Sequence, residues 1–206
     1  MKSILLQPCY FGDIAYYAHV VQNNPIKIEV HDNYQKQTYR NRCIIGTANG
    51  TLTLTIPVKH TGSKGHKKTS NAIIENNFHW QKEHWRSIQI AYRTSPFFEF
   101  YEDDIKFLFT ETFTNLLEFN LKTFDAVLDI LQIEKDISQT ESYEKEPEIF
   151  DGRFLANAKE KRSVELPEYM QVFDDKNGFI PHLSILDLIF NLGPQALTYL
   201  EELDLN

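Results

Sequence analysis

Residues 4–30 have the sequence ILLQPCYFGDIAYYAHVVQNNPIKIEV, which contains the pattern of a strand, a helix and a second strand. The apolar run at 4–6 is typical of a short buried strand. Gly12–Asp13 then offers a turn and a helix N-cap. Apolar side chains recur at helical spacing over residues 14–21, and Pro25 ends this helical pattern.

Residues 26–30 alternate apolar and polar side chains, as the second strand of this unit should. A strand, a helix and a strand in this order predict two parallel strands joined by a crossover. In such units ligands bind beyond the carboxyl ends of the strands. Residues 7–10 and 31–35 follow the two predicted strands, so we expect them to lie beside a cleft.

The rest of the chain predicts a β-hairpin followed by helices. Asn49–Gly50 stands between two β-rich runs, which is a strong hairpin signal. Helices are expected over residues 80–93, after Asp103–Asp104, along the stripe Leu121, Phe124, Leu128 and Leu131, from Ser184 with Asp187 as a capping box, and after Gly193–Pro194. The expected fold is mixed α/β: the strand-helix-strand unit and the hairpin form one mixed sheet, and the C-terminal half is mainly helical.

Composition favours one domain over residues 1–206, with a polar, solvated excursion near 134–148. The formal charge of -8 argues against general nucleic-acid binding. Only Cys9 and Cys43 are present, which suggests neither a disulfide framework nor a thiolate metal site. No signal peptide or membrane-spanning run is apparent, so we expect a soluble cytoplasmic protein without membrane insertion. We expect neither a metal nor a cofactor, and the oligomeric state is left open.

One window of this acidic chain lacks carboxylates. Residues 33–74 contain no Asp or Glu before Glu75, and within them residues 34–42 read YQKQTYRNR. The guanidinium group of arginine can donate two parallel hydrogen bonds to a phosphate or a carboxylate, and side-chain amides can form hydrogen bonds with sugar hydroxyls. The window therefore predicts a surface for a small anionic or sugar-containing ligand, although arginines in a surface loop also pair with acids elsewhere or remain solvated. The loop at residues 59–70 is expected to be a mobile binding element.

A second cluster of residues with functional side chains lies at 79–85, where the sequence is HWQKEHW. An imidazole carries protons readily at neutral pH, so His84 is a candidate for proton transfer, but a lone helical histidine is more often structural. His79 and His84 are too far apart in the helical repeat to form a zinc pair. Cys9 could act as a nucleophile only if its pKa were lowered, and a buried structural cysteine is the commoner case. No Gly-x-Ser-x-Gly elbow, P-loop or Gly-x-Gly-x-x-Gly motif is present.

Motifs spread over nearly the whole chain resemble those of the WbqC-like proteins. They are Leu6-Gln7-Pro8-x-Tyr10, Gln35-x-x-x-x-Arg40-Asn41-Arg42, Asn49-Gly50 with Thr55-Ile56-Pro57-Val58, Trp80-x-Lys82-x-His84-Trp85, Ala91-Tyr92-Arg93-x-Ser95-Pro96-Phe97-Phe98-x-x-Tyr101, Ser184-Ile185-Leu186-Asp187 and Asn191-x-Gly193-Pro194. Many members of that family carry a histidine directly before the Gln-Pro pair. This chain has Leu6 there, so a role of that histidine does not transfer.

The resemblance implies a role in surface-polysaccharide or O-antigen biosynthesis, where attachment of an aminoacyl or acyl group to an amino sugar has been proposed for the family. The leading hypothesis is a transferase-like enzyme acting on a sugar or nucleotide-sugar, and the alternative is a non-catalytic module that binds a glycan or a carrier. The candidate catalytic residues are His84 and Lys82. The candidate substrate-binding residues are Gln7, Tyr10, Gln35, Lys36, Arg40, Asn41, Arg42, Tyr92 and Arg93.

Overall fold

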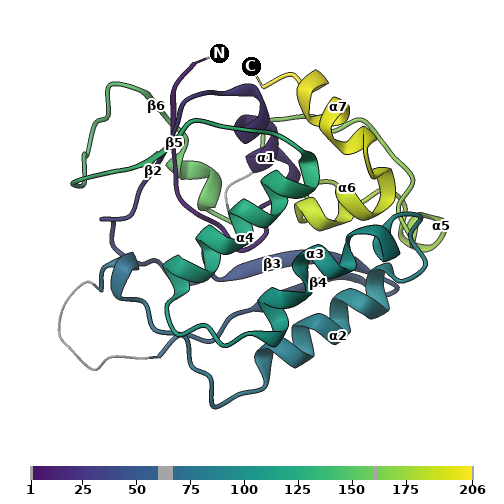
Figure 1. Cartoon of the computed structure of the whole chain (residues 1–206). Coiled ribbons are helices and arrows are strands. Elements are labelled where there is room, and N and C mark those ends of the chain that lie inside the picture. The colour runs from purple at the N-terminus through teal and green to yellow at the C-terminus, as the bar shows by residue number, and fades with distance from the viewer. Residues whose placement is uncertain (1, 60–66, 160–161, 206) are drawn as a thin grey trace.

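A parallel sheet and a separate β-hairpin form the β-structure of the chain (Figure 1). The computed structural model describes residues 2–59, 67–159 and 162–205. The predicted mixed α/β class is confirmed, and the later part of the chain contributes most of the helices. One detail differs from the expectation, because the hairpin does not join the parallel strands in one mixed sheet.

The parallel sheet has the strand order β5-β2-β1-β6. Its strands are β1 (Ile4–Leu6), β2 (Ile26–Ile28), β5 (Ile137–Gln139) and β6 (Phe150–Asp151). The predicted parallel pairing of the first two strands is confirmed, with Ile4 opposite Ile26. The chain leaves β1 toward β2 on one side and returns as β6 on the other, so the direction of winding changes beside β1. Open sheets bind ligands at such a point.

Helix α1 (Ile14–Gln22) connects β1 to β2 and begins at the predicted cap. The Asp13 carboxylate accepts a hydrogen bond from the Tyr16 backbone N–H at 2.8 Å, which satisfies one of the free donors of the first turn. Nearly all of α1 is buried, because it packs against α6 (Ile185–Leu192) and α7 (Gln195–Glu202).

The two faces of the parallel sheet are covered differently. Ile4, Leu6, Ile26 and Ile28 all belong to the main hydrophobic core. Leu5 and Lys27 point to the opposite face, since successive side chains alternate along a strand. They line a cavity of about 530 Å³ together with residues of the segment 140–149. A connecting segment, with open space beneath it, therefore lies where a helix usually covers a parallel sheet.

The hairpin consists of β3 (Arg42–Thr47) and β4 (Gly50–Thr55). The prediction of a hairpin at Asn49–Gly50 is confirmed, but only the glycine takes a positive φ, of 94°. Strand β3 packs against α2 (Trp80–Tyr92) and α6.

The remaining helical elements are η1 (Thr69–Asn71), α3 (Phe98–Thr110), α4 (Leu116–Leu131), η2 (Arg153–Ala156) and α5 (Asp174–Asn177). The helix expected after Asp103–Asp104 in fact begins at Phe98, because the Phe97 N–H bonds to the Phe190 carbonyl and the Phe98 ring is buried. The polar segment near 134–148 contains the exposed edge strand β5. No helix of the described residues has the length and apolar character that crossing a bilayer requires.

Gly193 ends α6 in a backbone conformation that side chains rarely adopt, with φ 55° and ψ -127°. A Cβ at this position would lie 2.5 Å from the Phe97 ring. Gly178 has a similar conformation, with φ 68° and ψ -178°, but a Cβ there would meet nothing within 4 Å.

Replacing Gly193 with alanine should therefore destabilise the protein more than replacing Gly178 with alanine. We expect Gly178→Ala to lower the free energy of unfolding by about 1 to 3 kcal/mol through backbone strain alone. Gly193→Ala should lose about 1 to 3 kcal/mol more through the clash with Phe97. Urea unfolding of both variants measures the difference, and equal losses would show that the Phe97 contact is not restrictive.

Candidate functional site

A cleft of about 630 Å³ opens at the carboxyl edge of the parallel sheet. Its walls come from the segments that follow β1, β2 and β6, which is where the change of winding direction predicts a ligand site. The lining residues are Gln7, His31, Asp32, Asn33, Gln35, Arg40, Lys68, Tyr143, Lys145, Asp151, Arg153, Phe154 and Asn157.

A buried ion pair joins three of these segments. The Arg40 Nη2 lies 2.8 Å from the Asp32 Oδ2, and the two side chains are only 3% and 6% exposed. The Gln7 amide donates to the same oxygen at 2.6 Å. The second carboxylate oxygen, Oδ1, is buried without a hydrogen-bond partner among the described residues, as is the Arg40 Nε. The ends of β1 and β2 are thus connected to the polar run at residues 34–42.

Asn120 of α4 holds the backbone at Pro8, directly after Gln7, and at Arg40. Its side-chain amide is fully buried and donates to the Pro8 carbonyl at 3.1 Å and to the Arg40 carbonyl at 2.8 Å. The Tyr16 hydroxyl of α1 donates to the Gln7 carbonyl at 2.9 Å. Because buried donors and acceptors need partners, these contacts fix the loops that carry Gln7 and Arg40.

Arg153 holds together the wall of the cleft that lies across from the Asp32–Arg40 ion pair. Its Nε and Nη2 donate to the two oxygens of Asp151 at 2.8 and 2.7 Å, which is the bidentate arrangement that arginine favours. Its Nη1 lies 3.7 Å from the buried carboxylate of Glu29. The hydrogen bonds that Arg153 donates to the Asp151 carboxylate are the main reason why the pKa of Asp151 is lowered.

The remaining lining groups differ in chemistry. Lys68 and Lys145 are exposed cations, and Tyr143 and Phe154 present aromatic rings that are 53% and 42% exposed. His31 is half-buried and contributes the one imidazole among the described residues that line the cleft. Amides, aromatic faces, cations and a proton carrier can together bind a polar ring that bears an anionic group.

The structure brings together Gln7, Gln35 and Arg40 of the predicted residues, all of which line the cleft. The other predicted residues do not line it. Tyr10, Asn41, Tyr92 and His84 are buried elsewhere, Arg42 is half-buried in β3, and Lys36, Lys82 and Arg93 are exposed outside the cleft. Asn41 acts on the backbone, since its amide donates to the Ile56 carbonyl at 3.2 Å. Lys64, in the loop expected to be a binding element, lies outside the described residues.

His84 lies in the aromatic core rather than in the cleft. Its side chain is 6% exposed, its Nδ1 is 3.0 Å from the Tyr10 hydroxyl, and its ring meets Trp80 edge-on. Loss of hydration lowers the pKa of the imidazole to about 4, although a hydrogen bond with the Thr55 backbone opposes the shift. The ring therefore stays neutral in the folded protein at neutral pH.

Both cysteines are buried free thiols. Burial raises the pKa of the Cys9 thiol to about 12, and the pKa of Cys43 to about 12 as well, so neither forms a nucleophilic thiolate at neutral pH. Among the described residues no group of three His, Cys, Asp or Glu side chains is placed to hold a metal ion.

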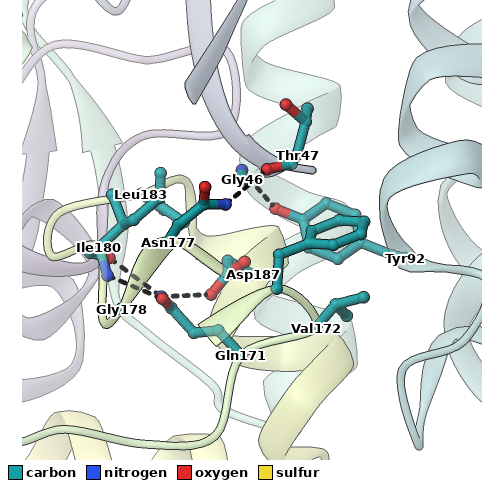
Figure 2. A pocket seen from close by; sticks show the side chains of 11 residues that line it. Gly46, Thr47, Tyr92, Gln171, Val172, Asn177, Gly178, Ile180, Leu183 and Asp187 are labelled. Atoms are coloured by element: carbon teal, nitrogen blue, oxygen red, sulfur yellow. Dashed lines mark hydrogen bonds between the residues drawn. The ribbon is translucent and has the colours of Figure 1, made fainter. Parts of the chain in front are cut away.

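A second, much smaller cavity of about 10 Å³ lies beside Asp187 of α6 (Figure 2). The Asp187 carboxylate accepts hydrogen bonds from the Gln171 amide at 3.0 Å and from the Tyr169 hydroxyl at 2.5 Å. Burial raises its pKa. Tyr92 lines this cavity and accepts a hydrogen bond from the Gly46 N–H at 3.3 Å. This polar cluster connects α6 to the hairpin and to the segment before α5. Tyr92, a predicted substrate-binding residue, and Asp187, predicted as part of a capping box, both belong to it.

Most of the other lining residues were not among the predicted site residues. His31 and Asp32 directly follow the predicted second strand and lie beside the cleft, as expected for residues 31–35, but neither was named as a candidate site residue. Lys68 belongs to the acid-free window. Asp151 and Arg153 could not be predicted as site residues, because the strand beside them, β6, is only two residues long and was not predicted.

Stability should depend on the protonation of His84. The unfolded chain binds a proton at this imidazole once the pH falls below about 6.5, whereas the folded protein binds it only near about 4, so folding is disfavoured as the pH falls between these values. His84→Asn keeps a polar group near Tyr10 but cannot titrate. Between about pH 7.5 and about pH 4.5 we expect wild type to lose about 2 to 3 kcal/mol more unfolding free energy than His84→Asn. Urea titrations at both pH values test this, and parallel losses in the two proteins would contradict it.

Comparison with known proteins agrees with the sequence resemblance. An uncharacterized protein of Mycobacterium tuberculosis, Rv1507c, is 28% identical over an alignment of 198 residues that covers 81% of this chain and 83% of that protein. No solved structure is significantly similar to the chain. The model of the WbqC-like protein family matches residues 7–160 and 154–199, which together include all described parts of the cleft. This chain belongs to the WbqC-like protein family.

Proposed function

We propose that this protein is an enzyme that modifies a sugar or a nucleotide-sugar in the cleft at the carboxyl edge of the parallel sheet. The observation that carries the proposal is the set of side chains that converge there. Gln7 and Gln35 supply amides, and Tyr143 and Phe154 supply exposed aromatic faces. Sugars are bound through hydrogen bonds to their hydroxyls and through contact of their apolar faces with aromatic rings.

His31 is the group suited to proton transfer in this cleft. It follows β2 directly, its backbone N–H bonds to Glu29 at 2.7 Å, and its side chain lines the cleft. The imidazole would accept the proton that a sugar hydroxyl or amino group loses when it attacks a donor. In this role His31 replaces His84, whose side chain is packed in the aromatic core.

Family membership supports a place in surface-polysaccharide or O-antigen biosynthesis, with aminoacyl or acyl transfer to an amino sugar as the candidate reaction. Such a transfer needs an acceptor held beside a base, and the amides beside His31 can supply that arrangement. No cofactor is part of the proposal.

A binding module without catalysis is the second candidate. Asp32 and Asp151 are both engaged by arginines, whereas His31 forms no ion pair among the described residues. The same lining side chains also suit recognition of a glycan that another enzyme modifies.

Substitution of His31 separates the two candidates. A panel of nucleotide-sugars and sugar phosphates, tested by thermal shift, should identify ligands that raise the Tm of the wild type. His31→Gln should still bind them but should lose about 100-fold or more in turnover of an identified substrate. His79→Gln, on the exposed start of α2, is the matched control and should retain its rate.

The results have distinct meanings. Loss of rate with retained binding supports the enzyme. Binding without turnover in the wild type favours the module. A flat thermal response over the whole panel would contradict both.

A further inference from the structure

The arginines of the cleft are already neutralised by carboxylates of the protein. Arg40 is paired with Asp32, and Arg153 is paired with Asp151 and lies near Glu29. A paired guanidinium offers little net attraction to a further anion. Arg40 of the acid-free run at residues 34–42 therefore acts as an internal counter-charge for Asp32.

Lys68 and Lys145 are the two lining cations that remain among the described residues. Neither forms an ion pair with a carboxylate of the described chain, and both side chains are exposed. Lys68 lies in the acid-free window, and its backbone forms a bridge with Asn33. Lys145 comes from the connection between β5 and β6. The two cations thus reach the same cleft from separate segments of the chain.

We call residues 141–148 the strap, and its residues 143–146 place their side chains alternately on two sides, whereas Pro147 lines the same cavity as its two neighbours. Tyr143 and Lys145 line the cleft. Glu144, Glu146 and Glu148 line the cavity of about 530 Å³ on the other side, above the sheet face. This alternation is that of an extended chain, and it directs the lysine to the cleft and the glutamates away from it.

The strap is held near its middle by Arg153. The guanidinium donates to the carbonyls of Glu144 and Lys145 at 2.8 and 3.2 Å, and it lies 5.1 Å from the centre of the Tyr143 ring. The strap is otherwise largely exposed and passes outside the helices as the green connection between β5 and β6 (Figure 1). A segment with open space on both sides and few apolar contacts can move at low free-energy cost.

We propose that Lys68 and Lys145 form a phosphate-binding subsite, and that a phosphate group bound between them draws the strap onto the cleft. The inference rests on the proposed function only in placing the ligand in the same cleft. The ligand class it names is a compound with a phosphate or diphosphate group, such as the diphosphate of a nucleotide-sugar. Ammonium groups bind phosphate as point charges, so two lysines on opposite walls suit a group with several anionic oxygens.

Calorimetry with uridine diphosphate and with inorganic diphosphate tests the subsite. Lys68→Gln and Lys145→Gln should each weaken binding about tenfold, because each removes one charge-assisted contact. Lys122→Gln, an exposed lysine of α4 that does not line the cleft, should leave the affinity unchanged.

Limited proteolysis tests the movement of the strap. A glutamate-specific protease should cut wild type after Glu144, and uridine diphosphate should slow this cut at least about threefold if the phosphate holds the strap down. The protection should be lost in Lys68→Gln, which leaves the strap sequence unaltered.

The outcomes distinguish this inference from the proposed function. Nucleotide-sugar binding that is insensitive to both lysine substitutions would overturn the subsite and leave the sugar-modifying enzyme standing. Lysine-dependent binding of inorganic diphosphate, without any gain from a sugar, would support the subsite and count against the enzyme. Absence of binding by both diphosphate and nucleotide-sugars would overturn both.

Discussion

The ion pair between Asp32 and Arg40 is the contact on which the cleft depends. Both side chains are almost fully buried, so each has lost most of its hydration and relies on the other for compensation. Removing one partner of such a pair typically lowers stability by about 3 to 5 kcal/mol, because the remaining charge stays buried. Gln7 donates to the same carboxylate, so the end of β1, the end of β2 and the polar run after it are held in one arrangement.

The two walls of the cleft differ in how firmly they are fixed. On one side Asn120 donates to the carbonyls of Pro8 and Arg40, and the aromatic core packs beneath. On the other side Arg153 connects β6 to the strap through backbone carbonyls, with a cavity behind it. Sites that must admit and release a ligand commonly combine a rigid wall, which orients the ligand, with a more mobile wall, which adapts to it.

Local patterns predicted the fold better than the site. The cap at Asp13 and the stop at Gly193 each depend on a few neighbouring residues and were predicted correctly. The alternation from residue 26 also found β2, although the strand ends at Ile28 and Glu29 is buried. Gln7 was found because it follows the first predicted strand, and Arg40 because it lies in a run without carboxylates. His84 was placed in the site because a histidine between two tryptophans has no sequence feature that separates a core ring from a catalytic one. The strap could not be found, since its role depends on Arg153 and on the pairing of a two-residue strand.

A crystal structure of the protein with a bound nucleotide-sugar would test most directly the claim that this buried ion pair builds the ligand site. The account predicts ligand density in the cleft, with hydroxyls near Gln7 and His31 and the Asp32–Arg40 pair intact beneath them. Density beside His84, or in the cavity at Asp187 with the cleft unoccupied, would contradict it.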